Sequence, residues 1–189
     1  MAGLASMCYF YFDFKDTTKR DVRGLLTSLL DQLCDQSDHF WDLLSQSYVT
    51  HRSGAEQPSE AKLTQCLKDV LDVHGQPPIY IIVDAVDECP NTPYTSSPRE
   101  RVLKLLEHLV KLRFSNLRIL VTSRPEHDIR PVLESLAPHH ISLHDQSGQH
   151  DDIISYIESF VHSCGVTRRW RAEDKDLVIH TLSEGANGM

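Results

Sequence analysis

Residues 76–90 read QPPIYIIVDAVDECP, and they give the strongest indication of the fold class of the chain. Five β-branched or aromatic residues, Ile79–Val83, follow one another between flanking prolines, a composition typical of a short strand buried on both faces. Such strands occur in parallel α/β sheets. The strand stops at Asp84, and Asp87 and Glu88 follow closely. The sequence therefore places carboxylates at the sheet edge where this fold class binds ligands.

The carboxylates after this strand suit a divalent cation. Mg²⁺ prefers hard oxygen ligands and usually joins one or two carboxylates to substrate phosphates. Asp84, fixed by the apolar strand, fits the role of a Mg²⁺ ligand acting through water. Glu88, with Asp87 beside it, fits the role of orienting a water for attack on a γ-phosphate. The alternative is an ordinary acidic turn, because Asp and Glu are common after strands.

A second motif follows the first along the chain. Residues 117–125 read LRILVTSRP, an apolar run whose polar end contains Arg124. Residues 81–88 resemble the Walker B motif of NACHT domains, and residues 117–125 resemble that family's next strand with its sensor arginine. Over nearly its whole length the chain is similar to the NACHT-type (STAND) P-loop NTPases. It is most similar to the fungal members, whose NTPase region is nephrocystin-like.

This resemblance implies a fold, a function and a set of site residues. The implied fold is α/β, a three-layer αβα arrangement with a mostly parallel sheet, and the implied function is an ATP-driven signalling switch. Mg²⁺ and ATP are the implied cofactors. Glu88 and Asp87 take the catalytic roles, while Asp84 and Arg124 contact the nucleotide and its metal. For Arg124 the alternative is a salt bridge to Asp84 or Glu126.

The motif that would bind the phosphates is missing from the sequence. No GxxxxGK[ST] occurs, and there is no Gly-Lys pair. Such a loop supplies the N–H cradle and the lysine that hold the phosphates. We therefore expect a partial P-loop NTPase that lacks its first P-loop strand and hydrolyses ATP weakly or not at all. The parent family uses Mg²⁺ and ATP, and this chain alone is expected to use the same cofactors or none. The ending SEGANGM resembles the start of the family's glycine-methionine-aromatic motif, cut after its methionine.

Two other classes of function remain as alternatives. The first is a non-catalytic interaction module that pairs with itself or with a related NACHT protein through an exposed sheet edge. Removing the first P-loop strand would leave the strands expected at residues 117–121 and 140–143 with unpaired edges. The second is an unrelated α/β hydrolase or phosphotransfer domain with Asp84 as nucleophile, which would need companion motifs that the sequence lacks.

Composition excludes several classes of protein. The net charge of −8 over 189 residues argues against a nucleic-acid-binding surface, and only residues 167–171 are locally basic. No apolar run is long enough for a membrane span, and the start lacks the pattern of a signal peptide, so a cytoplasmic protein is expected. The five cysteines form no CxxC pair, which argues against a disulfide framework. The histidines show no metal-ligand spacing.

The remaining patterns place the other elements. Residues 1–148 are expected to form the NTPase core and residues 149–189 the start of a helical extension. Asp16 and Asp128 are expected to cap the helices that follow them. Besides those named above, we expect a strand at residues 6–14 and helices at 22–33, 40–48, 60–71, 99–113, 129–136, 151–161 and 172–182.

Overall fold

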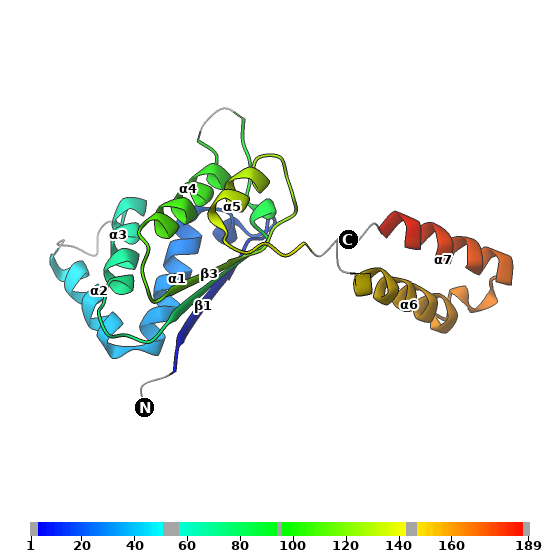
Figure 1. Ribbon diagram of the computed structural model, residues 1–189, viewed down its shortest axis with the longest axis horizontal. Helices are drawn as coiled ribbons and strands as arrows, with labels where there is room; N and C mark the ends of the chain where they lie inside the picture. Colours follow the sequence, from blue (N-terminus) through cyan, green and yellow to red (C-terminus); the bar gives the residue numbers. More distant parts are fainter. Residues whose placement is uncertain (1–3, 51–56, 94–95, 143–146, 187–189) are drawn as a thin grey trace. The chain divides into compact units, whose positions relative to one another are not determined.

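The computed structural model describes residues 4–50, 57–93, 96–142 and 147–186 (Figure 1). By its contacts the chain divides into two compact units, Met1–Ala137 and Pro138–Met189, which are considered separately. The expected motif at the end of the chain falls partly on residues 187–189, which lie outside the described residues.

The first unit is built on a parallel sheet of three strands, β1 (Ser6–Tyr11), β2 (Ile79–Asp84) and β3 (Leu117–Val121). Their order is β1-β2-β3, so β2 lies in the centre. In this register Asp84, the last residue of β2, lies beside Tyr11 of β1. The expected α/β class with a parallel sheet is thus confirmed.

The other elements in the described part of this unit are η1 (Thr17–Lys19), α1 (Val22–Gln36), α2 (Asp38–Thr50), α3 (Glu60–Leu71), η2 (Val86–Glu88), α4 (Pro98–Lys111) and α5 (Arg130–Leu136). Helices α1 to α4 and the two short 3-10 turns lie between the strands, and helix α5 follows the last strand. Leucines at helical spacing bury one face of α1, α3 and α4, whose N-caps Asp21, Ser59 and Ser97 accept backbone N–H groups through their side chains.

Two of the expected caps are wrong. Asp16 caps η1 rather than α1, because a 3-10 turn precedes the long helix and Asp21 takes its N-cap position. Asp128 does not cap α5, which begins after Ile129 with no side-chain cap. Its carboxylate is used elsewhere, in a tertiary contact with Arg99.

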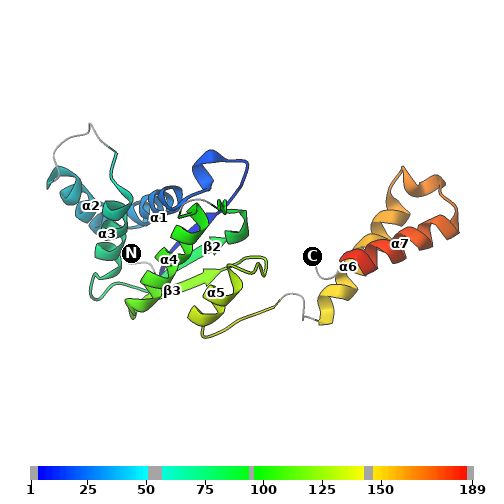
Figure 2. The same ribbon diagram turned by 90° about the horizontal axis from the view of Figure 1, so that it is seen from above.

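The helices α1, α3 and α4 pack on one face of the sheet, where their leucines form a single core with the inward residues of β1 and β2 (Figures 1 and 2). Strand order explains this arrangement. Crossovers between parallel strands are right-handed, and the strands advance in one direction from β1 to β3. Every crossover helix must therefore lie on the same face.

The expectation that β2 is buried on both faces is wrong for the described residues of this unit. Ile79, Ile81 and Val83 are buried, whereas Tyr80 on the opposite face is 45% exposed. Leu120 of β3 is 57% exposed, and the outward residues of β1 are similarly open. A crossover helix would cover this face only if the strand order turned back on itself, so that one crossover ran in the opposite direction along the sheet. The order β1-β2-β3 of the described strands does not turn back.

The strand expected at residues 140–143 is also not formed. His140, Ile141 and Ser142 have no strand assignment, and residue 143 lies outside the described residues. Within the described chain, β3 pairs with β2 alone, so its outer edge is free, as expected for a sheet that lacks a further strand. A short segment has no ladder to join when its neighbouring strand is missing.

The second unit is a helical pair, α6 (Ser147–Ser163) and α7 (Ala172–Ala186), joined by the 3-10 turn η3 (Thr167–Arg169). Helix α6 begins earlier than the expected Asp151. The hydroxyl of Thr167 is buried and donates to the carbonyl of Val161 at 2.6 Å, which ties the turn to the end of α6. None of the described helices combines the length and apolar character needed to cross a bilayer.

Candidate functional site

The carboxyl ends of β2 and β3 lie side by side and carry all the residues that the sequence singled out. Asp84 closes β2, and the chain then turns through Ala85, whose backbone is left-handed at φ 55° and ψ 49°. This turn directs η2, which holds Asp87 and Glu88, across the end of the sheet. Arg124 follows the end of β3.

Thr122 joins the two strand ends at Asp84. Its hydroxyl donates to the Asp84 carboxylate and also accepts the N–H of Ala85 at 3.0 Å. The carbonyl of Thr122 accepts the N–H of Val86 at 3.1 Å. The left-handed turn is therefore fixed by β3, and the Asp84 carboxylate stays exposed with a single defined hydrogen-bond donor.

Asp87 holds the segment that carries Arg124. One carboxylate oxygen accepts the Arg124 N–H at 3.0 Å, and the other lies 3.5 Å from its Nε. The side chain of Asp87 is only 11% exposed, whereas that of Arg124 is 73% exposed. The ion-pair alternative for Arg124 is thus realised with Asp87 and not with Asp84 or Glu126. The end of its guanidinium remains free to meet an anion in solution.

Glu88 faces the other neighbouring strand. Its carboxylate accepts the N–H of Phe14, just after β1, at 3.3 Å. A hydrogen bond of this length is weak, so another partner can replace it readily. All four predicted residues thus lie at one edge, but Glu88 and Arg124 extend toward opposite neighbours of β2.

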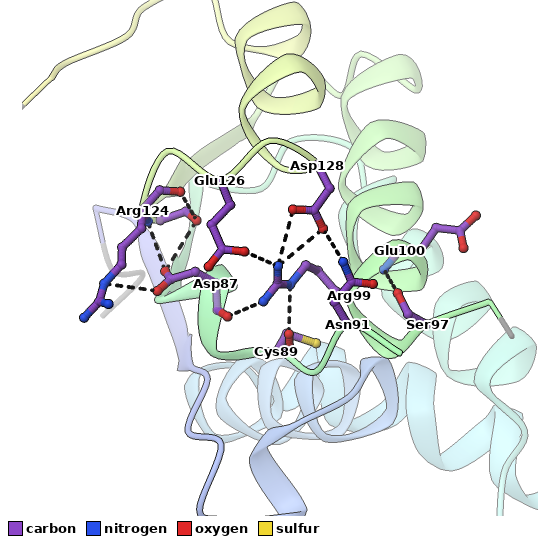
Figure 3. Close-up of polar contacts among 10 residues, drawn as sticks. Asp87, Cys89, Asn91, Ser97, Arg99, Glu100, Arg124, Glu126 and Asp128 are labelled. Atoms are coloured by element: carbon purple, nitrogen blue, oxygen red, sulfur yellow. Dashed lines mark hydrogen bonds and ion pairs between the residues drawn. The ribbon is translucent and has the colours of Figure 1, made fainter. Parts of the chain in front are cut away.

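Sequence reasoning missed the centre of the polar network, which is the buried Arg99 (Figure 3). This side chain comes from the first turn of α4 and is 7% exposed. Its Nε donates to the carbonyl of Cys89 at 2.9 Å, and its other nitrogens reach the carbonyl of Asp87 and the carboxylates of Glu126 and Asp128. Asn91 donates to Asp128 at 2.8 Å and completes the network.

Arg99 therefore connects three segments: η2, the start of α4 and the loop between β3 and α5. Two carboxylates balance its buried charge, which is the arrangement a buried guanidinium requires. One signal in the sequence points to it, because a cation in the first turn of a helix is unfavourable beside the helix dipole. Arg99 at the start of α4 thus indicates a tertiary partner.

The nearby thiol of Cys89 is structural. It is fully buried and donates to the carbonyl of Arg20 at 3.3 Å. Burial raises its pKa to about 12. The same cause raises the pKa of Cys8, a core residue of β1, to about 12. Neither sulfur is a nucleophile at neutral pH.

The described residues do not build a complete metal site. Nowhere in the described ranges do three or more His, Cys, Asp or Glu side chains gather closely enough to hold an ion. Asp87 already binds Arg124, so among the described residues of this edge Asp84 is the exposed carboxylate suited to a cation. A magnesium ion would thus need further oxygen ligands from a bound phosphate, water or residues outside this set.

Comparison with known proteins identifies the family. Residues 2–124, well over half of the chain, match the family described as Nephrocystin 3, N-terminal. The chain belongs to this family. No curated protein and no solved structure matches it.

The match of the nephrocystin 3 N-terminal family ends at Arg124 and so contains β1, β2, β3 and their connections. The whole edge formed by Asp84, Asp87, Glu88 and Arg124 lies inside it. Glu126 and Asp128, which hold Arg99, lie just beyond it.

Proposed function

We propose that this nephrocystin 3 N-terminal family member carries the metal and sensor half of a NACHT-type nucleotide switch. The observation that supports the proposal is the convergence of Asp84, Asp87, Glu88 and Arg124 at the ends of two adjacent parallel strands. Sheets of this class bind their ligands at that edge. The phosphate-binding loop would come from residues outside this sequence, which contains no GxxxxGK[ST].

Each residue has one role in this proposal. Asp84, oriented by Thr122, would hold Mg²⁺ through water, and the ion would neutralise charge on the phosphates of ATP. Glu88 would leave its weak bond to Phe14 and orient the attacking water. Asp87 positions Arg124, whose exposed guanidinium would bind the γ-phosphate and report its loss.

The chain on its own is expected to hydrolyse ATP weakly or not at all, because no described group cradles the β- and γ-phosphates. The first experiment is to sequence the 5′ end of the transcript and search in frame for a strand followed by GxxxxGK[ST]. The longer product should turn over ATP, and Asp84→Asn or Glu88→Ala should abolish turnover. Glu100→Gln, on the exposed side of α4, is the matched control and should retain it.

Two results would contradict the proposal. One is ATP turnover by the 189-residue chain itself that Glu88→Ala abolishes, since the half-site would then suffice. The other is a longer product with full activity after both substitutions at Asp84 and Glu88.

A second candidate function is a non-catalytic module that joins a related NTPase. The free outer edge of β3 favours it, because an unpaired strand accepts another strand by backbone hydrogen bonds. Size-exclusion chromatography of the chain, alone and with a relative that contains a P-loop, tests this function. A monomer that does not bind the relative would count against it.

A further inference from the structure

The two edges of the sheet differ in how their backbone groups are satisfied. Within one strand, the N–H and C=O groups of successive residues point alternately to opposite sides. Ser6 and Phe12 donate toward β2, which places the backbone groups of Met7, Tyr9 and Tyr11 on the outer side of β1. These groups are the ones that a strand added beyond β1 would use.

Two glutamines of α1 occupy the outward groups of Met7 and Tyr9. The amide of Gln32 accepts the N–H of Tyr9 at 3.1 Å and donates to its carbonyl at 2.8 Å. The amide of Gln36 does the same for Met7, accepting at 3.0 Å and donating at 2.7 Å. Each side chain thus supplies the donor and the acceptor that a neighbouring strand would supply.

The spacing of the two residue pairs makes this match possible. Four residues of helix advance by about 6 Å, and two residues of strand advance by about 6.6 Å. Gln32 and Gln36 therefore reach alternate residues of β1 from consecutive turns of α1. Because α1 runs back along β1, the later glutamine meets the earlier strand residue.

The outer edge of β3 has no such cover in the described chain. The N–H of Thr122 donates to β2, so the backbone groups of Ile119 and Val121 point outward. Among the hydrogen bonds of the described residues, none reaches these groups of Ile119 or Val121. The glutamines thus cover Met7 and Tyr9 at one edge of the sheet, whereas no described group covers Ile119 and Val121 at the other.

We propose that Gln32 and Gln36 form a clamp that closes β1 to strand addition, so that any further strand joins this sheet at β3. The species that the clamp excludes at β1 is a second copy of this chain. The exposed face of β1 carries Met7, Tyr9 and Tyr11, each about half exposed, and an apolar edge strand of this kind pairs with its own copies when its backbone is free. This inference does not depend on nucleotide binding.

Residue-resolved amide exchange by NMR tests the clamp directly on the full chain. Gln32→Ala should speed exchange of the Tyr9 N–H by about tenfold and leave Met7 unchanged, and Gln36→Ala should do the reverse. Gln65→Ala is the matched control, because Gln65 of α3 bonds to Asp69 on its own helix. Unchanged exchange of both amides in the two variants would overturn the proposal.

Sedimentation velocity over a range of concentrations tests the consequence. The double variant Gln32→Ala/Gln36→Ala should self-associate more than the wild type, by about tenfold in the association constant. Adding Tyr9→Pro should return it to wild-type behaviour, because the Tyr9 N–H points away from β2 and its loss removes only an edge donor. The control Gln65→Ala should sediment as the wild type does.

Two outcomes would overturn the inference. One is a folded double variant, judged by circular dichroism, whose association equals that of the wild type. The other is a double variant that does not fold. Alanine favours the helix, so a loss of folding would mean that the glutamines hold the fold together rather than close an edge.

Discussion

Replacing Arg99 by methionine removes the buried cation while keeping a long apolar side chain in its place. The substitution leaves the carbonyls of Asp87 and Cys89 without their donors. It also leaves Glu126 and Asp128 without their cation, although these two carboxylates are 40% and 25% exposed and regain water. A buried carbonyl that loses its donor costs about 1–3 kcal/mol, and the two carboxylates add little because water can solvate them again. We therefore expect the free energy of unfolding to fall by about 3 kcal/mol.

Native-state hydrogen exchange measures this loss within the first unit alone. The amides of Ile81 and Val83, in the buried centre of β2, exchange only when this unit opens globally. Arg99→Met should speed their exchange on the order of 100-fold. The matched control is Arg124→Met, which removes a cation that is 73% exposed and should cost less than about 1 kcal/mol.

The Arg99 network supports the fold only if Arg99→Met speeds exchange much more than Arg124→Met does. If Arg99→Met and Arg124→Met speed exchange equally, the Arg99 network does not support the fold, and its contacts with η2 and the β3–α5 loop are incidental. An additional Glu126→Gln substitution should cost little in the Arg99→Met background and more in the wild type, because the two side chains form one ion pair.

Three further predictions concern the backbone and the buried thiols. Ala85→Gly should raise the free energy of unfolding by about 1 kcal/mol in urea titrations, because φ is 55° at this position. Gly24→Ala should lower it by at least about 2 kcal/mol in the same assay, because an added Cβ would lie 2.1 Å from the carbonyl oxygen of Thr18. The buried thiols of Cys8 and Cys89 should make stability fall with rising pH: burial raises their pKa values from 9.0 to about 12, so the unfolded state ionises first and stability declines from about pH 9 upward. Urea titrations between pH 7 and 11 would show this decline, and Cys8→Ala/Cys89→Ala should reduce it.

The sequence predicted the parts of the site that depend on local pattern. The apolar runs before Asp84 and before Thr122 specify strands whatever their neighbours are, because their residues favour a pleated, buried environment. Two parallel strands joined by one helix end at the same edge of a sheet. These facts place Asp84, Asp87, Glu88 and Arg124 together.

The partners of those residues were not predictable from local pattern. Arg124 pairs with Asp87 rather than with Asp84 or Glu126 because the turn at Ala85 brings the Asp87 carboxylate to the Arg124 N–H and Nε. Asp128 binds Arg99 instead of capping α5, since a buried guanidinium gains more from a carboxylate than an exposed helix end does.

Local sequence specified the three strands of the sheet, the helices and the edge at which the carboxylates gather, because side-chain periodicity and apolar runs act over a few residues. It did not specify whether residues 140–142 join the sheet, which face of the sheet is covered or which charges meet. Those features depend on the order of strands far apart in the chain and on the right-handed crossovers between them. The single covered face, the Arg99 network and the glutamines on β1 all follow from that order.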